Sequence, residues 1–356
     1  MLKIKHITNL LAFKEIKAEW ESFEGNYTVF QTWLWNFIWT KTVLENNKKY
    51  FLDIQLIYKN NELVAIFPFF YEKYAFLNIK LYHFLGHRMS YHNDVLLSKK
   101  VEHNDIDALI EFFLENLTFN SIMLLRHMNE EAIFTRKLIE LNYAEPQCKR
   151  LIVKNDITLS DQSNRFKKKV RGNYRRRLNK FKKEYDYIIR VNKGSDARRA
   201  FNKVIDLHLK RFHSQGKETL LEGDNLLFMN EILEESHEKI DFEVIELFNG
   251  NEVVASKLMI KDGDSYYYIN GGFDPKYSQY SPLMILITVT MDRGFNELLC
   301  QNFDLGAGYE KYKYDWDPTI KQNYFCCLCS NNLYSKSIAA CIKAMFRRKL
   351  PPDPRL

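Results

Sequence analysis

The sequence lacks an uninterrupted apolar run of the roughly 18 residues that a membrane-spanning helix needs. Its first residues also lack the apolar core of a secretory signal, so we expect a cytoplasmic protein that at most touches the inner face of the membrane. The six cysteines show no paired framework, which fits a reducing compartment. Cys326, Cys327 and Cys329 form the one close group, and we expect small buried side chains there and no metal site.

Several catalytic signatures are missing as well. The chain has no Gly-x-Ser-x-Gly elbow, no His-Glu-x-x-His pair and no Walker loop. These absences argue against an esterase, a zinc protease and a nucleotide triphosphatase. The sequence also has no low-complexity tract, so we expect folded domains along most of its length.

The length and composition are sufficient for two cores. With 356 residues, 46% hydrophobic and 15% aromatic, the chain can build two domains of ordinary size. Alternation of strand and helix patterns predicts an α/β protein. We expect an N-terminal domain over residues 1–155, a basic linking helix over 156–184 and a C-terminal domain over 185–356.

An internal repeat supports duplicated domains. Residues 54–65 align without gaps on residues 244–255, and Asn61-Glu62-x-Val64-Ala65 recurs as Asn251-Glu252-x-Val254-Ala255. Each copy lies at the turn of an apolar hairpin. One such match is expected of any hairpin, because polar turn residues between strand-forming residues are common. Two hairpins placed alike in halves of similar length favour a duplication.

The stretch from Asp241 to Trp316 gives the most specific pattern. Two apolar strand patterns meet across Asn249-Gly250, a dipeptide that tolerates positive φ and favours a tight hairpin. A third strand follows Asp262-Gly263, and Ser281-Pro282 then opens an apolar helix. The free N–H groups in the first turn of such a helix form an anion site suited to a cofactor phosphate.

A basic block precedes this stretch. Between Arg165 and Lys183 lie 11 of the 52 lysines and arginines and no acidic residue. Apolar residues recur every three or four positions, which predicts a helix with one apolar stripe: Phe166, Val170, Tyr174, Leu178 and Phe181. Its remaining faces are either solvated or a surface for an anionic partner, such as a nucleotide sugar, a lipid headgroup or RNA.

Three motifs carry a resemblance to a known family. They are Leu207-His208 with Arg211 and Gly216, the helix start Tyr280-Ser281-Pro282, and the run Asp304…Gly308…Tyr312-Lys313…Trp316. In order and spacing, residues 160–318 resemble GNAT-type acyltransferases related to the cellulose-biosynthesis protein CelD. They are more distantly similar to the Fem aminoacyltransferases.

The resemblance implies two tandem GNAT-like domains, each a mixed, mainly antiparallel twisted sheet flanked by helices. It also implies transfer of an acyl group from acetyl-CoA or another acyl-CoA to an amine. The implied acceptor is a sugar, a nucleotide sugar or a cell-surface glycoconjugate precursor. The helix start Ser281, Pro282, Leu283 and Met284 would bind the cofactor, although a glycine usually follows Ser-Pro in the family.

Four residues are candidates for catalysis. Lys313 follows a Gly-x-Gly loop, where its ammonium could approach an acyl carbonyl, or it caps nearby carbonyls. Asp304 either orients the acceptor amine or caps the glycine-rich turn. His208 is either a general base, given its ordinary pKa of ~6.5, or a buried structural histidine. Tyr312 supplies a further hydroxyl.

Four residues are candidates for binding substrate. Arg211 lies one turn after His208, on the same helix face. Tyr267 alternates with Tyr266 and Tyr268, so either it or its two neighbours face the cleft. Gly308 belongs to the loop before Lys313. Asp94 ends the polar loop from Gly86, which either contacts substrate or is an ordinary turn.

Two rival functions remain open. One is Fem-like aminoacyl transfer from charged tRNA, which the basic block favours. The other is a catalytically silent GNAT-like pair that binds an anionic polymer or membrane, which Leu283 favours because its Cβ would crowd a phosphate.

Overall fold

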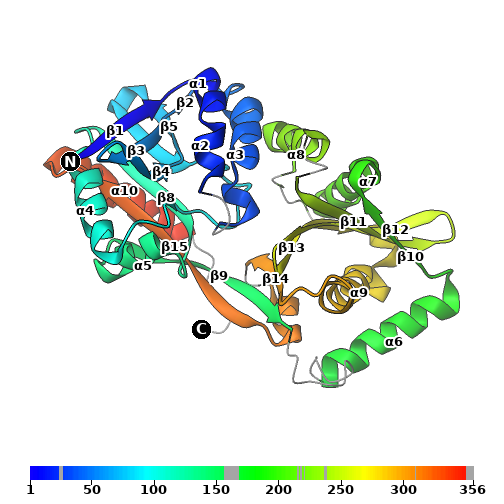
Figure 1. Ribbon diagram of the computed structural model, residues 1–356. Coiled ribbons are helices and arrows are strands. Elements are labelled where there is room, and N and C mark those ends of the chain that lie inside the picture. The colour runs from blue at the N-terminus through cyan, green and yellow to red at the C-terminus, as the bar shows by residue number, and fades with distance from the viewer. Residues whose placement is uncertain are drawn as a thin grey trace. The chain divides into compact units, whose positions relative to one another are not determined.

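The computed structural model describes residues 1–23, 27–155, 168–214, 216, 219, 221–235, 239–308 and 310–349. The chain forms two compact units (Figure 1). The first combines Met1–Lys149 with Gln322–Leu356, and the second is Arg150–Lys321. Two long strands, β9 (Ala144–Lys154) and β15 (Thr319–Cys329), carry the chain from one unit to the other.

The first unit contains two sheets, with the strand orders β1-β3-β4-β7 and β15-β8-β6-β5-β2. Its strands are β1 (Leu2–Ile7), β2 (Tyr50–Leu52), β3 (Ile54–Lys59), β4 (Glu62–Phe67), β5 (Phe69–Tyr74), β6 (Ile79–Phe84), β7 (Leu96–Leu97) and β8 (Ser121–Asn129). Its helices are α1 (Leu10–Glu15), α2 (Lys17–Glu21), η1 (Val29–Gln31), α3 (Trp33–Trp39), η2 (Thr40–Leu44), η3 (Ala75–Leu77), α4 (His103–Glu115), α5 (Ile133–Glu140) and α10 (Leu333–Lys349).

The second unit is built on the strand order β10-β11-β12-β13-β14-β9. Its remaining strands are β10 (Ile188–Lys193), β11 (Asp241–Asn249), β12 (Glu252–Asp262), β13 (Ser265–Phe273) and β14 (Asn302–Ala307). Its helices are α6 (Lys168–Glu184), α7 (Gly194–His213), α8 (Gly223–Glu235), η5 (Pro275–Tyr280), α9 (Pro282–Asn296) and η6 (Lys311–Trp316). All recorded neighbours in this sheet are antiparallel except the parallel pair β13 and β14. The predicted mixed, mainly antiparallel sheet flanked by helices is confirmed.

The C-terminal segment differs from the expected domain division. The sequence predicts one domain over residues 185–356, whereas residues 322–356 cluster with the first unit. The reason is strand pairing: β15 is antiparallel to β8 from Asn323↔Asn129 to Cys329↔Ile122. Phe346 of α10 then packs on Phe325 of β15, with ring centroids 4.7 Å apart.

The two repeated hairpins share a detail of backbone structure. In the first unit the β3–β4 register shifts between Ile57 and Tyr58. In the second, the β11–β12 register shifts between Leu247 and Phe248. These are aligned positions of the repeat, so each hairpin has its bulge at the same place. A shared bulge supports the duplication, because bulges are specific features that change the twist of a strand.

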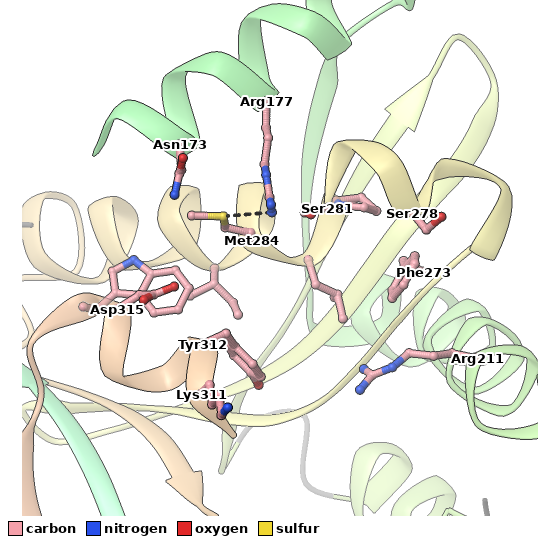
Figure 2. Close-up of a pocket in the computed structure, with 14 residues that line it drawn as sticks. Asn173, Arg177, Arg211, Phe273, Ser278, Ser281, Met284, Lys311, Tyr312 and Asp315 are labelled. Carbon is pink, nitrogen blue, oxygen red and sulfur yellow. Dashed lines mark hydrogen bonds between the residues drawn. The ribbon is translucent and has the colours of Figure 1, made fainter. Parts of the chain in front are cut away.

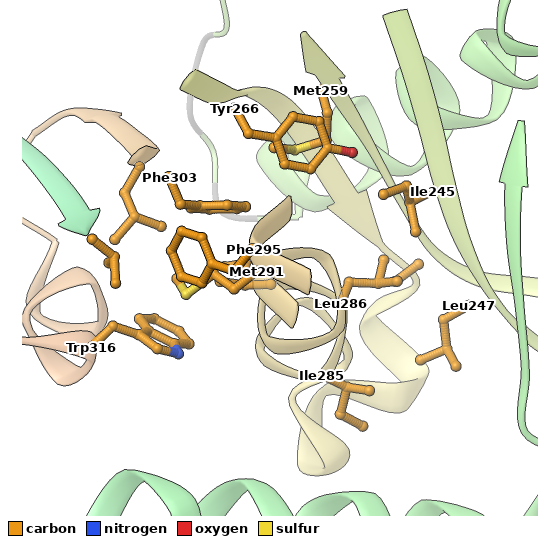
Figure 3. Close-up of a cluster of buried hydrophobic side chains, with 14 of the residues drawn as sticks. Ile245, Leu247, Met259, Tyr266, Ile285, Leu286, Met291, Phe295, Phe303 and Trp316 are labelled. Atoms are coloured by element: carbon orange, nitrogen blue, oxygen red, sulfur yellow. The ribbon is translucent and has the colours of Figure 1, made fainter. Parts of the chain in front are cut away.

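Helices cover both faces of the second unit's sheet (Figure 1). Helix α7, backed by α8, packs on β11, β12 and β13, while α9, backed by α6, packs on the other face. Figure 3 shows the core beneath α9, where Leu286, Met291 and Phe295 meet Ile245 of β11 and Trp316 of η6. Burial of these side chains holds α9 against the sheet and so fixes where the helix begins.

The stripe predicted on the basic helix is confirmed where it is described. Phe181 is fully buried, and Tyr174 and Leu178 pack against the same core. Phe166 and the side chain of Val170 lie outside the described residues. The opposite face of α6 exposes a set of cations: Arg175, Arg176, Lys180, Lys182 and Lys183.

A buried ion pair joins β11 to α9. Arg293 Nη2 lies 2.8 Å and Nε 3.0 Å from the two carboxylate oxygens of Glu243, which is fully buried. Lys193 adds a contact of 2.8 Å. Burial would raise the pKa of Glu243, but the hydrogen bonds from Arg293, Lys193 and Tyr266 outweigh it and lower the pKa to about 2. The carboxylate is therefore charged at neutral pH and holds α9 to the sheet.

Close approach of α7 to β13 depends on Gly272. A Cβ at this position would lie 2.2 Å from the backbone nitrogen of His208 and 2.3 Å from the carbonyl carbon of Leu207. We predict that Gly272→Ala destabilises the protein by at least the ~1–3 kcal/mol typical of overpacking, because backbone must move. Urea or thermal unfolding checks this.

Gly172→Ala is the matched control, since Gly172 lies in α6 and a Cβ there would meet no atom within 4 Å. Alanine favours a helix by about 1 kcal/mol over glycine, so this variant should be at least as stable as the wild type. Equal stability of Gly272→Ala and the wild type would contradict the close contact.

Candidate active site

The parallel pair β13 and β14 opens into a wedge. The two strands pair only at Ser265↔Asn302, Tyr266↔Phe303 and Tyr267↔Asp304. Both continue, β13 to Phe273 and β14 to Ala307, but within the described residues no further pairing joins them. An unpaired strand edge offers main-chain donors and acceptors to an extended ligand.

A cavity of about 510 Å³ lies beside the start of α9 (Figure 2). It is lined from α6, α7, the end of β13, α9 and η6 by Asn173, Arg177, Arg211, Phe273, Ser278, Ser281, Pro282, Leu283, Met284, Ile287, Lys311, Tyr312, Asp315 and Trp316. Three cationic side chains and one carboxylate face it, so the cavity favours an anionic ligand. The size is that of a small-molecule site.

The start of α9 contributes backbone donors to this cavity. Ser281 has a left-handed backbone (φ 49°) and makes no side-chain cap bond. The N–H groups of Met284 and Ile285 both bond to the Ser281 carbonyl, and Pro282 has no N–H. Among the described residues the N–H of Leu283 has no such partner, so it is the donor left for a ligand. The Leu283 side chain forms part of the wall, and the cavity remains open beside it.

Two further side chains line the cavity, those of Arg177 and Trp316. Arg177 reaches down from α6, and its Nη1 lies 3.5 Å from the sulfur of Met284 (Figure 2). This is a weak acceptor for a guanidinium, so most of its donors are left for a ligand. The indole N–H of Trp316 is buried without a hydrogen-bond partner among the described residues. Buried donors without partners are rare and indicate an unfilled role.

Lys257 of β12 lies where the wedge closes. Its side chain is fully buried, and its Nζ has no hydrogen-bond partner among the described residues. The Nζ is 4.4 Å from the ring centroid of Tyr268 on β13 and 5.3 Å from that of Phe303 on β14. Burial lowers the pKa of Lys257 well below its usual 10.5. Lys257 was not predicted as a site residue, although a lysine within the apolar run of Val253 to Ile260 is a visible signal.

The structure brings six of the predicted site residues together around the cavity. They are Arg211, Ser281, Pro282, Leu283, Met284 and Tyr312. Asn173 and Arg177 of α6 and Lys311 of η6 were not predicted, because the two helices meet only in the folded unit.

Gly308 directly follows β14, and Lys313 lies in η6. Lys313 is buried, and its Nζ donates to the Ala307 carbonyl at 2.9 Å and pairs with Glu310 at 3.1 Å. A Cβ on Gly308 would lie 2.2 Å from a Glu310 carboxylate oxygen, so the glycine leaves room for this pair. The lysine therefore caps a carbonyl, the second of the two roles considered for it.

Asp304 and His208 are also held by structural contacts. Asp304 Oδ1 accepts a hydrogen bond from the Gly306 N–H at 2.7 Å, and Oδ2 lies 3.2 Å from Arg150 Nε. His208 contacts the Gly271 carbonyl through Nδ1 at 3.1 Å and the Thr219 hydroxyl through Nε2 at 2.6 Å. Burial lowers the pKa of His208, so the ring is neutral at pH 7 and bridges α7 to β13.

Tyr267 and Asp94 are buried outside the cavity. Tyr267 is 6% exposed and pairs with Asp304 in the sheet, and burial raises its pKa. Asp94 belongs to the first unit, where it accepts a hydrogen bond from the Val95 N–H at 2.8 Å. Burial raises the pKa of Asp94 to about 8.

Metal-ligand groups and membrane-spanning helices are both absent from the described part of the chain. No group of three or more His, Cys, Asp or Glu side chains there is arranged to hold a metal ion. No helix there combines the length and apolarity that crossing a bilayer requires.

We predict that Lys257→Met raises the stability of the protein at neutral pH. A buried donor without a partner costs about 1–3 kcal/mol, and methionine fills a similar volume without that penalty. Because the folded pKa is depressed, the unfolded chain binds more protons, and wild-type stability rises as the pH increases toward 10.5. The advantage of the variant should therefore shrink with rising pH.

Thermal unfolding across this pH range is the measurement, with Lys261→Met on the same strand as control. Lys261 donates to the Gly263 carbonyl at 3.3 Å and is partly exposed, so its replacement should not produce this pH-dependent gap. A Lys257→Met protein less stable than the wild type at neutral pH would show that the amine has a stabilising partner.

Comparison with known protein families finds a match within the second unit. Residues 168–314 match the family described as acetyltransferase (GNAT) domain. No curated protein matches the chain in sequence.

Solved structures share the fold over nearly the whole chain. FemX is similar with a TM-score of 0.62 at 11% identity, covering 96% of this chain and 100% of FemX. A C-terminal DUF2156 domain from Agrobacterium fabrum gives 0.56 at 8% identity, covering 93% and 96% of the two chains. L-PGS from Bacillus licheniformis gives 0.50 at 13% identity, covering 85% and 90%. The tandem GNAT-like fold expected from the sequence is thus shown, and together with the match over residues 168–314 it supports an acyltransferase with a GNAT domain in its second unit.

Proposed function

We propose that the protein transfers an acyl group from acyl-CoA, in the first instance acetyl-CoA, to an amine. The observation that supports this most directly is the cationic cavity at the start of α9, which adjoins the unpaired edge of β13. Acyl-CoA combines a diphosphate with a long chain that carries amide groups. An anion site next to an unpaired strand edge suits both parts.

In this proposal the diphosphate lies against the Leu283 N–H and the Arg177 guanidinium, with Arg211 as a second cation. Charge-assisted hydrogen bonds to phosphate are stronger than neutral ones. The pantetheine amides then follow the edge of β13 toward the point where the strands meet. The Cβ of Leu283 was expected from the sequence to crowd a phosphate. In this proposal its backbone N–H binds the anion and its side chain forms part of the cavity wall.

The chemistry requires one proton transfer in each direction. The acceptor amine attacks the thioester carbonyl, a C–N bond forms and the nitrogen loses one proton to solvent. The C–S bond breaks, and the thiolate takes up one proton. Tyr312, 37% exposed on the cavity wall, is our proposal for the donor to the thiolate. Lys313, with Glu310, holds the turn that precedes Tyr312 and is proposed as a positioning residue.

The acceptor is proposed from the sequence resemblance alone. Relatives of CelD point to an amino group on a sugar, a nucleotide sugar or a cell-surface glycoconjugate precursor.

Aminoacyl transfer from charged tRNA is the second candidate. The exposed cations of α6 favour it, because a row of them suits a nucleic-acid backbone. Stabilisation of the protein by tRNA and not by CoA would select this reading.

We predict that Arg177→Gln raises the KM for acetyl-CoA about tenfold, because one charge-assisted hydrogen bond is lost. The assay follows isotope-labelled acetyl transfer to a panel of amino sugars and amino-sugar nucleotides. Arg175→Gln is the control, since Arg175 lies on the exposed side of the same helix, outside the cavity.

An unchanged KM in Arg177→Gln, or an equal rise in Arg175→Gln, would contradict a diphosphate site at the start of α9. The first result places the anion elsewhere, and the second attributes binding to the general charge of α6.

A further inference from the structure

A group of basic side chains in the first unit lies far in sequence from the cavity and has no part in the proposed reaction. Its members are His83 at the end of β6, His87 and Arg88 in the following loop, and Arg126 and His127 in β8; we call it the basic cluster. Arg126 Nη2 lies 3.1 Å from Nε2 of His87, and the rings of His83 and His87 are 4.7 Å apart. Of these elements, only the loop stood out in the sequence.

The basic cluster has no acidic counterpart. Among the described residues no carboxylate pairs with Arg88 or Arg126, and the Nε of Arg126 is buried without a hydrogen-bond partner. Burial, followed by the charge of Arg88, lowers the pKa of Arg126 to about 10. Partly buried cations that repel one another are unfavourable unless an anion balances them.

Its histidines act as hydrogen-bonding groups and not as charges. Burial and the nearby arginines lower the pKa of His83 and of His127 to about 3, and that of His87 well below its usual value. At neutral pH the two guanidinium groups therefore supply the charge. The neutral ring of the half-buried His87 can donate one N–H to a ligand. His127 is already occupied, because its Nε2 lies 3.2 Å from Gln147 Nε2 and its Nδ1 lies 3.9 Å from Cys148 Sγ.

The backbone of the basic cluster is held in an unfavourable conformation. Arg88 and His127 both have left-handed φ angles, 69° and 56°. The surrounding structure enforces them: the His127 N–H donates to Gln147 Oε1 at 2.7 Å, and the Ser90 N–H donates to the Gly86 carbonyl at 2.9 Å. Strain of this kind persists mainly at functional sites.

Packing fixes the guanidinium of Arg126 in place. Its Cζ lies 5.5 Å from the ring centroid of Phe346, and its Nη2 lies 3.1 Å from Nε2 of His87. A guanidinium that is already oriented loses little conformational entropy when it binds an oxyanion. Arg88 is exposed and Arg126 half-buried, so a ligand can reach both.

We propose that the basic cluster binds a phosphate group of a small soluble ligand, a phosphomonoester or a diphosphate. Two guanidinium charges without a carboxylate match a dianion better than a monocarboxylate. The planar forks of arginine bind phosphate oxygens in pairs, and the neutral imidazole of His87 supplies a further donor. This site is independent of the proposed acyl-CoA cavity, since its residues lie in the other unit.

The test measures binding of inorganic phosphate and of diphosphate to the full-length protein by thermal shift, at constant ionic strength and with acetate as the monocarboxylate comparison. A ligand that binds only the folded state raises the melting temperature. Phosphate can also enter the cavity at α9, so each titration is repeated in the Arg177→Gln background. We expect a phosphate-dependent rise that survives Arg177→Gln and exceeds that with acetate.

Arg88→Gln is the diagnostic variant, because Arg88 is exposed and glutamine meets the same φ requirement. It should weaken phosphate binding about tenfold, as expected for one lost charge-assisted contact. Arg136→Gln is the control: this arginine of the same unit donates to the Glu131 carbonyl and lies outside the basic cluster. Its phosphate affinity should equal that of the wild type.

A second readout follows the histidine ring signals by ¹⁵N NMR during the phosphate titration. Shifts of these ring signals that phosphate causes in the wild type but not in Arg88→Gln support the site. Phosphate affinity in Arg88→Gln equal to the wild type, no phosphate shift in the wild type, or an equal shift with acetate would each overturn the proposal. Acyl-CoA binding at α9 is tested separately, by the KM for acetyl-CoA of Arg177→Gln.

Discussion

The parting of β13 and β14 after three paired residues is the constraint on which the second unit depends. Parallel strands cannot be joined by a tight turn, so the chain crosses over through α9, whose N-terminus lies near the end of β13. The same crossover brings η6, with Tyr312 and Trp316, to the cavity from the end of β14. One local feature of the sheet therefore places an unpaired edge, a helix start and an aromatic wall together.

Packing on the two faces of the sheet keeps this wedge in place. On one face Gly272 lets the backbone of α7 touch β13, and His208 bridges the two. On the other, the Glu243–Arg293 pair and the apolar core hold α9. Lys257 is the exception to this well-satisfied interior, because its amine lies between two rings without a hydrogen-bond partner among the described residues. A group that lowers stability in this way is typical of a functional position.

The local elements were predictable from the sequence because their signals are local. Asn249-Gly250 predicted the hairpin, and Ser281-Pro282 predicted the start of α9. The two bulges fall at aligned positions of the sequence repeat, although hydrophobic periodicity alone does not predict a bulge. The sequence assigned the C-terminal segment to the second domain. The pairing of β15 with β8 joins residues about 200 positions apart and leaves no mark in composition.

The site was predicted only in part, because its residues come from elements that are distant in the sequence. The helix-start residues, Arg211 and Tyr312 line the cavity. Arg177 was not singled out, because it is one of the 11 cations between Arg165 and Lys183 and the sequence does not distinguish it from the others. Lys313, Asp304 and His208 have the residue types that catalysis uses, and sequence cannot tell a free side chain from one bonded to a carbonyl or an arginine. Their recorded contacts favour structural roles.

The most direct measurement is a crystal structure of the protein with CoA bound. The account predicts density for the diphosphate within hydrogen-bonding distance of the Leu283 N–H and the Arg177 guanidinium, with the pantetheine chain along the edge of β13 beyond Tyr267. A cavity that stays empty at saturating CoA, or CoA bound away from the start of α9, would contradict it.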